Sequence, residues 1–155
     1  MTLHTGDLAP DFTLRDQHGR RHSLGALRGE RAAVLVFFPF AFSGVCTGEL
    51  RELRDDARRI ADAGAELLGI SCDPMFSLRV FADRDGLEFP LLSDFWPHGE
   101  VASAYGAFDV DHGCPTRSTF VVDQDGLVRW SVENPMGEAR SIDEYVHALE
   151  ALRAG

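Results

Sequence analysis

Short apolar segments alternate along this chain with amphipathic ones, and Gly and Pro residues stand between them. The segment 33–38 (Ala-Val-Leu-Val-Phe-Phe) is continuously apolar and rich in β-forming residues, which predicts a central strand covered on both faces. The segment 65–71 predicts a second buried strand by the same pattern. Within 46–63, apolar residues recur at helical spacing opposite a charged face, which predicts the longest helix of the chain, ended by Gly64.

The remaining periodic segments complete an alternation of strands and helices. They predict, in chain order, a hairpin of 11–15 and 22–24, a helix at 77–85, a strand at 90–92, a helix at 100–105, a hairpin of 118–122 and 127–132, and a final helix from 142. This order predicts an α/β protein with a thioredoxin-like fold, in which a mixed central sheet has helices on both faces and the chain opens with a β-hairpin. No linker or repeat interrupts it, so we expect one domain over residues 1–155.

Composition narrows the class of protein. The 155 residues, 45% hydrophobic and 26% charged, suit one globular domain. The formal charge of −10 disfavours binding to nucleic acid or to an anionic membrane. The longest apolar run, 32–42, is far shorter than the roughly 20 residues of a membrane-spanning helix. The first residues do not form a basic stretch followed by an apolar run, so we expect no signal peptide and a cytoplasmic location.

The cysteine count points away from a disulfide framework. Cys46, Cys72 and Cys114 are odd in number and few for a chain of this size, so reduced thiols are expected. Cys46 lies on the first turn of the long predicted helix, directly after the central strand, where α/β sheets bind ligands. The free N–H groups and partial positive charge of a helix start favour a thiolate. Ser43 lies three residues earlier with a hydroxyl, and Pro39 can shield the sulfur.

At these residues the sequence resembles the peroxiredoxins. Their motif is Pro, three residues, Thr, two residues, Cys, and Pro39, Ser43 and Cys46 stand at that spacing with Ser in place of Thr. Arg117 matches the family's further active-site arginine, which precedes a strand.

The resemblance covers nearly the whole chain. It includes segments 9–14 and 90–99, and the run Phe-Trp-Pro-His-Gly at 95–99 is most similar to the one-cysteine alkyl hydroperoxide reductase E class. It implies a thiol-dependent peroxidase that reduces hydrogen peroxide and alkyl hydroperoxides, with peroxynitrite as a further candidate. In this chemistry the thiolate attacks a peroxide oxygen and becomes a sulfenic acid.

The same resemblance assigns roles to individual residues. Cys46 is the expected peroxidatic cysteine, and Glu49 is the residue expected to orient Arg117. The expected substrate-binding groups are the Arg117 guanidinium, the Ser43 hydroxyl and the backbone N–H groups of Val45 and Cys46, and Pro39 completes the catalytic set. Because Ser43 lacks the methyl group that fixes the rotamer of a threonine, we expect looser positioning of the substrate.

The other two thiols leave the recycling route open. Cys72 follows a predicted strand and is expected to be buried and inert. Cys114 lies in a Gly- and Pro-containing loop three residues before Arg117, and we expect it to be exposed at the rim of the site. Two interpretations follow: Cys114 resolves the sulfenic acid, or an external thiol or a thioredoxin- or glutaredoxin-like protein does so. The resemblance further implies a homodimer, and neither a cofactor nor a metal ion is expected.

The same residues also allow other functions and simpler structural roles. General thiol–disulfide exchange is disfavoured because the helix start carries no Cys-x-x-Cys. A thioredoxin-fold redox sensor or chaperone that uses Cys46 oxidation without turnover is the alternative function. Each site residue also has a structural reading: Cys46 as a buried apolar side chain, Ser43 as a helix cap, Arg117 and Glu49 as solvated charges. Phe40 and Phe42 are expected at the pocket mouth or a subunit interface, and the charged run 54–59 as a solvated helix face.

Overall fold

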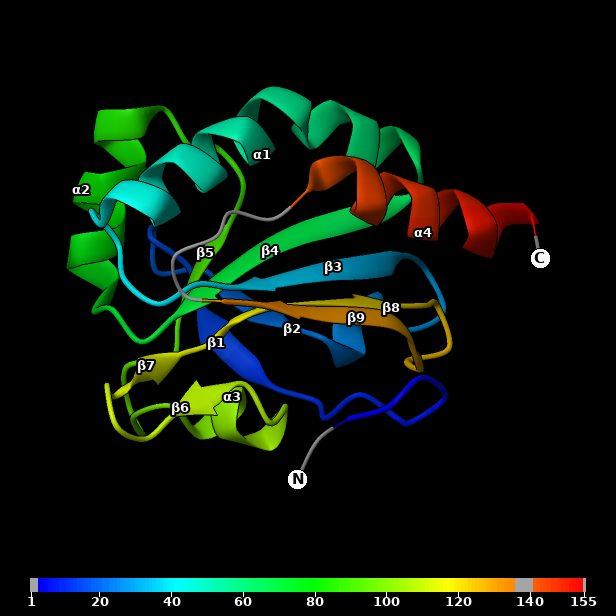
Figure 1. Cartoon of the computed structure of the whole chain (residues 1–155), viewed down its shortest axis with the longest axis horizontal. Helices are drawn as coiled ribbons and strands as arrows, with labels where there is room; N and C mark the ends of the chain where they lie inside the picture. The colour runs from blue at the N-terminus through cyan, green and yellow to red at the C-terminus, as the bar shows by residue number, and fades with distance from the viewer. Residues whose placement is uncertain (1–2, 136–140, 155) are drawn as a thin grey trace.

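A seven-stranded mixed sheet forms the centre of the protein, in the order β2-β1-β5-β4-β3-β8-β9 (Figure 1). The computed structural model describes residues 3–135 and 141–154. The strands of the sheet are β1 (Thr13–Arg15), β2 (Arg21–Ser23), β3 (Ala32–Phe37), β4 (Ala65–Ser71), β5 (Leu91–Ser93), β8 (Arg117–Val122) and β9 (Val128–Asn134). The predicted fold, with its N-terminal hairpin of β1 and β2, is thereby confirmed.

Strand β3 connects the two halves of the sheet. It pairs in parallel with β4 and antiparallel with β8, and all six of its residues are buried. Val34 and Val36 face one apolar core, and Leu35 and Phe37 face the other. This two-sided burial is the reason that the strand is continuously apolar in sequence.

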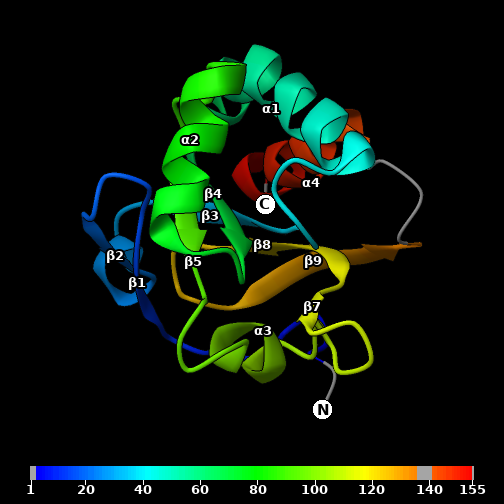
Figure 2. The ribbon, with the colours of Figure 1, turned by 90° about the vertical axis from the view of Figure 1, so that its left-hand side faces the viewer.

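Helices cover both faces of the sheet (Figures 1 and 2). Helices α1 (Gly44–Asp62), α2 (Met75–Asp85) and α4 (Ile142–Ala154) lie on one face, and the short α3 (Glu100–Ala104) lies on the other. Helices α1 and α2 each begin two residues earlier than the sequence pattern predicts. Among the described residues, no helix is both long and apolar enough to span a bilayer.

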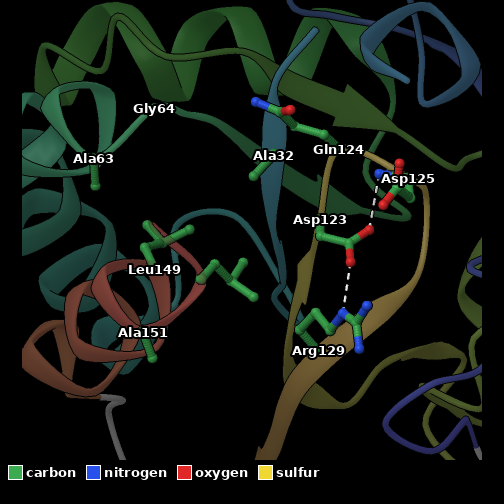
Figure 3. Close-up of a pocket in the computed structure, with 10 residues that line it drawn as sticks. Ala32, Ala63, Gly64, Asp123, Gln124, Asp125, Arg129, Leu149 and Ala151 are labelled. Carbon is green, nitrogen blue, oxygen red and sulfur yellow. Dashed lines mark hydrogen bonds and ion pairs between the residues drawn. The ribbon is translucent and has the colours of Figure 1, made fainter. Parts of the chain in front are cut away.

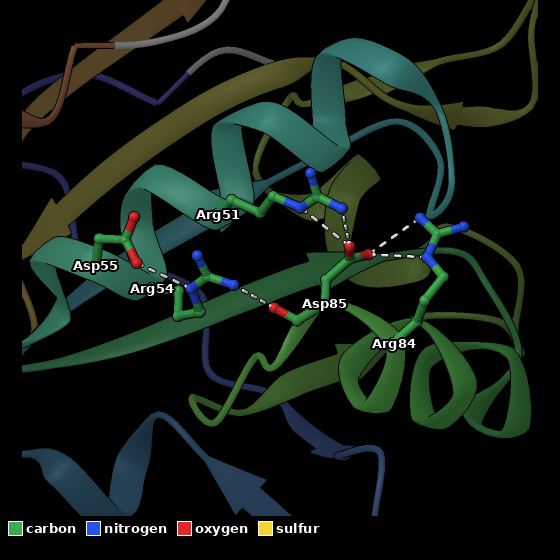
Figure 4. A network of polar contacts seen from close by, with 5 residues as sticks. All are labelled: Arg51, Arg54, Asp55, Arg84 and Asp85. Atoms are coloured by element: carbon green, nitrogen blue, oxygen red, sulfur yellow. Dashed lines mark hydrogen bonds and ion pairs between the residues drawn. The ribbon is translucent and has the colours of Figure 1, made fainter.

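Helix α1 is joined to α2 through the buried carboxylate of Asp85 (Figure 4). Arg51 of α1 and Arg84 of α2 both donate to this carboxylate, and Arg54 donates to the Asp85 carbonyl oxygen at 2.6 Å. The expectation that the run 54–59 is a wholly solvated face is therefore wrong at Arg54, because this side chain reaches α2.

The pattern did not predict the small two-stranded sheet of β6 (Phe108–Asp109) and β7 (Cys114–Pro115). In this antiparallel pair, Cys114 lies opposite Asp109. Two-residue strands are too short to show a period of alternation, so the sequence pattern predicts only a loop here.

Candidate active site

Cys46 is the third residue of α1, and the loop 38–43 connects this helix to the carboxyl end of β3. The helix begins its hydrogen bonding with Thr47 N–H, which donates to the Ser43 carbonyl at 2.9 Å. The N–H groups of Val45 and Cys46 lie before that bond, at the open end of the helix. The side chain of Cys46 is 0% exposed. The predicted position of the thiol at a helix start is confirmed.

Arg117 and Glu49 form a buried ion pair beside the sulfur. The Arg117 Nη1 donates to Glu49 Oε1 at 2.8 Å, and its Nη2 donates to Cys46 Sγ at 3.3 Å. Both charged side chains are 2% exposed, so neither is a solvated surface charge. Glu49 lies one turn after Cys46 on α1, whereas Arg117 begins β8, and the pairing of β8 with β3 brings the arginine to the helix start.

This arrangement has a clear electrostatic consequence. Within a water-excluded site, a guanidinium beside the sulfur stabilises a negative charge on it more strongly than in water. Glu49 balances the arginine charge and fixes the plane of the fork, so that one nitrogen stays on the carboxylate while the other stays on the sulfur. The structure therefore brings together three residues separated by up to 71 positions in the sequence.

Two further residues of the motif lie in the loop before α1 and at its start. Pro39 is buried and Ser43 is half-buried. Among the described residues, Ser43 stands at the N-cap position without a hydrogen bond from its side chain to the helix, so the reading of its hydroxyl as a cap is not supported. Phe40 and Phe42 are exposed, as are Val45 and the aromatic residues Phe95 and Trp96.

The structure corrects the expected position of Cys114. This side chain is 0% exposed, because the β6–β7 pair folds it into the interior and not onto the rim of the site. Burial, with smaller contributions from the charges of Asp109 and Cys46, raises the pKa of the Cys114 thiol to about 11. Cys72 is also buried, as predicted, and burial with the nearby charge of Asp94 raises its pKa to about 12. Both thiols are protonated at neutral pH.

Asp73 is a residue near the site that the sequence pattern did not single out. Its carboxylate accepts a hydrogen bond from the backbone N–H of Ala41, in the loop before α1, at 2.8 Å. No spacing motif links these two positions, which lie 32 residues apart. Only the neighbouring ends of β3 and β4 in the sheet bring them into contact.

A cavity of about 600 Å³ lies elsewhere (Figure 3). It is located at the amino end of β3, at Ala32, between the last turns of α4 and the turn that connects β8 to β9. Its polar lining consists of the turn residues 123–125 and Arg129, and it contains neither Cys nor His. Among the described residues, no three His, Cys, Asp or Glu side chains gather as they would around a metal ion. The Cys46 sulfur and this cavity therefore lie at opposite ends of the sheet.

Comparisons with known proteins show what the whole chain is similar to. The AhpC/TSA family model matches residues 5–131. The chain is 45% identical to alkyl hydroperoxide reductase E of Mycobacterium tuberculosis over 98% of this chain and 99% of that protein. Its structure is similar to peroxidoxin BcpB of M. tuberculosis, with a TM-score of 0.86, 35% identity, and 97% and 99% of the two chains covered. It is also similar to AhpC of Enterococcus faecalis, with a TM-score of 0.89, 27% identity, and 99% and 94% covered.

Proposed function

This chain belongs to the AhpC/TSA family of peroxiredoxins, and we propose that Cys46 is the sulfur at which it reduces peroxides. The chain is a thiol-dependent peroxidase, in keeping with the names of its relatives. The observation that supports Cys46 as its peroxidatic residue is the contact of the buried Arg117 guanidinium with the Cys46 sulfur. Among the described contacts, no guanidinium lies against the sulfur of Cys72 or Cys114. Burial raises the pKa of both thiols.

The proposed reaction begins with the Cys46 thiolate. The sulfur attacks one oxygen of the peroxide, the O–O bond breaks, and the second oxygen leaves as hydroxide or alkoxide, which takes up a proton to form water or an alcohol. Cys46 is oxidised to the sulfenic acid while the peroxide is reduced. Negative charge moves from the sulfur to the leaving oxygen during this step, and fixed donors along that path lower the barrier.

The donors proposed for this path are those of the helix start and the ion pair. The Arg117 fork contacts the sulfur, and the Ser43 hydroxyl with the N–H groups of Val45 and Cys46 would hold the peroxide. Glu49 keeps the fork in its plane. Buried Pro39 adds no N–H donor, and in this proposal it shields the sulfur.

Replacement of the thiols tests this assignment. Cys46→Ser should abolish peroxide consumption, whereas Cys72→Ser should retain it, because the Cys72 thiol is protonated at neutral pH. Consumption is followed with hydrogen peroxide or an organic hydroperoxide and dithiothreitol as reductant. A Cys46→Ser protein that consumes peroxide at the parental rate would contradict the proposal. Oxidation of the parent protein once, without cycling in any thiol, would favour the redox sensor.

We further propose that an external thiol or a small thioredoxin- or glutaredoxin-like protein reduces the sulfenic acid. The support is the state of the two other thiols, since buried, protonated sulfur is a poor nucleophile. Intact mass after one equivalent of peroxide tests this in the parent, Cys72→Ser and Cys114→Ser proteins. A gain of one oxygen in all three supports external recycling. An intramolecular disulfide that disappears in one variant identifies a resolving cysteine instead.

A homodimer and a cytoplasmic location complete the proposal. The exposed aromatic residues Phe40, Phe42, Phe95 and Trp96 all follow the carboxyl ends of parallel strands, and apolar side chains of this kind are typical of a subunit interface. Light scattering of the parent and of Trp96→Arg tests the dimer, which the substitution should weaken. The three unbonded cysteines suit a reducing compartment.

A further inference from the structure

Asp73 ties together the ends of three neighbouring strands. Its carboxylate oxygen Oδ2 accepts hydrogen bonds from the Ala41 N–H, beyond β3, and from the Ser71 hydroxyl, at the end of β4, both at 2.8 Å. Its backbone carbonyl accepts a hydrogen bond from the Ser93 hydroxyl, at the end of β5, at 2.6 Å. The connection to Ala41 is the one that reaches the active-site loop.

The backbone of the next residue, Phe42, needs the support of neighbouring contacts. Phe42 has a φ of 70°, a left-handed backbone conformation that a side chain other than glycine rarely adopts. Strained conformations of this kind persist only where surrounding contacts hold them. The Phe42 ring packs against Phe81 at 5.1 Å and under the Arg84 guanidinium at 4.8 Å. Asp73 provides a second stabilising contact, the hydrogen bond that it accepts from the N–H of the preceding residue, Ala41.

We propose that Asp73 is a positioning residue of the peroxidase reaction. The hydrogen bond that it accepts from the Ala41 N–H fixes the loop that presents Ser43 and Cys46 to the peroxide. The loop ends at the start of α1, so a shift of its backbone moves the Ser43 hydroxyl relative to the sulfur. Rates of positioned reactions fall by about 100-fold when reacting groups are displaced by about 1 Å. This inference rests on the proposed role of Cys46.

The charge of Asp73 also reaches the interior around the site. After burial and the charges of nearer groups, it contributes to the raised pKa values of both Cys72 and Cys114. The negative charge of Asp73 therefore acts on both of these thiols.

The test compares two reactions of the same sulfur. Oxidation of Cys46 by hydrogen peroxide depends on the groups that hold the peroxide, whereas alkylation by iodoacetamide depends on the thiolate and its access alone. In single-turnover measurements, Asp73→Ala should slow the peroxide reaction by about 10- to 100-fold and leave the alkylation rate unchanged. Asp73→Asn keeps an oxygen that can accept from Ala41 N–H and should restore most of the peroxide rate.

A matched control separates positioning from a general loss of stability. The Asp123 carboxylate, like that of Asp73, accepts hydrogen bonds within a loop, but it lies at the far end of the sheet. Its donors are the backbone N–H groups of Asp125 and Leu127. Asp123→Ala should retain the parental peroxide rate.

Three results would overturn the inference: an unchanged peroxide rate in Asp73→Ala, an equal loss in Asp73→Asn, or a parallel loss of alkylation. Each presupposes that the unsubstituted protein consumes peroxide and that this consumption depends on Cys46. Failure of that prior condition would instead refute the proposed function.

Discussion

At the scale of single residues, Arg117 has an unusual environment for a permanently charged side chain. It is almost fully buried, and its fork joins the Glu49 carboxylate to the Cys46 sulfur. Removal of a buried charge from water costs several kcal/mol, which a pairing partner of good geometry offsets (about 3–5 kcal/mol is lost when one partner is removed). The ion pair is therefore maintained for the field that it creates at the sulfur more than for stability.

The shape of the arginine fork is therefore expected to matter as well as its charge. Arg117→Lys keeps a positive charge but cannot contact Glu49 and the sulfur with two coplanar nitrogens. We expect the rate of Cys46 oxidation to fall by about 100- to 1,000-fold, the usual effect of the loss of one donor in a transition-state site. Stopped-flow mixing with hydrogen peroxide measures the rate. Arg129→Lys, at the exposed pair with Asp123, is the control and should react as the parent does.

Ser43 allows a second prediction at this scale. Ser43→Ala removes the hydroxyl and should slow oxidation of Cys46 by up to about 10-fold, the worth of one neutral hydrogen bond. Ser43→Thr retains the hydroxyl and adds a methyl group that restricts its rotation, so it should react at least as fast as the parent. The second-order rate constants of the three proteins decide the matter. A faster alanine variant would show that the hydroxyl does not bind the peroxide.

The residues that the sequence revealed were those with a fixed spacing or a local signal. Cys46, Ser43 and Pro39 form one motif, and Arg117 was found through the strand that follows it. Glu49 is buried and paired with Arg117, so its interpretation as a solvated helix residue is wrong. Asp73 was missed because its partner Ala41 contributes only a backbone N–H, which has no sequence signature. The burial of Cys114 was missed because it depends on the β6–β7 pair.

At the scale of elements, the contact between α1 and α2 supports the helix that carries Cys46. Asp85 is buried at its centre, and its two arginine partners, Arg51 and Arg84, are each about half exposed. After loss of the carboxylate, water can still solvate both cations, which limits the cost. The loop before α1 adjoins the same contact, because Arg84 also lies over the ring of Phe42, which packs against Phe81.

Substitution of Asp85 measures that support. Asp85→Asn should lower the free energy of unfolding by about 1–3 kcal/mol, because it removes the charge that pairs with Arg51 and Arg84. The exposed pair of Asp55 with Arg54 provides the control, and Asp55→Asn should change stability by less than about 1 kcal/mol. Urea unfolding followed by circular dichroism gives both values. Equal stabilities of the two variants would contradict a special role for the α1–α2 contact.

Elements long enough to repeat their apolar pattern several times were predicted well, and shorter elements were not. The buried strands β3 and β4 and the amphipathic α1 were identified from pattern alone, with errors of at most two residues. The start of α2 was placed late, since its N-cap is Pro74, which has no capping side chain. Short pairs such as β6 and β7 depend on tertiary contacts that a local pattern does not contain.

At the scale of the whole molecule, several buried and partly buried carboxylates link stability to pH. Burial alone would raise the pKa of Asp16, Asp85 and Asp123, but hydrogen bonds and neighbouring cations outweigh it and hold each pKa below its usual value. Their stabilisation is present above the unfolded pKa near 3.9 and is lost as the pH falls through the lower folded values. Asp94 acts in the opposite direction, because burial raises its pKa.

The pKa of Asp109 is also lowered, chiefly by its hydrogen bond with His112, so four lowered pKa values stand against the one raised value of Asp94. The urea midpoint should be steady near neutral pH and fall progressively below about pH 5. A series of urea titrations between pH 7 and pH 3 measures the midpoint, and Asp85→Asn should show a shallower acid dependence than the parent. A midpoint that holds constant down to pH 3 would show that these carboxylates are not coupled to folding.

Because Cys46 is completely buried, the proposed reaction also requires an opening step before each oxidation. A peroxide molecule meets the sulfur only while the covering groups have moved aside, so the observed rate combines the frequency of opening with the rate of the chemical step. Side-chain rotations occur in picoseconds to nanoseconds, whereas loop motions take nanoseconds to microseconds. When opening is faster than attack, the rate of oxidation rises in proportion to peroxide concentration. When opening is slower than attack, the rate of oxidation levels off at high peroxide at the rate of opening.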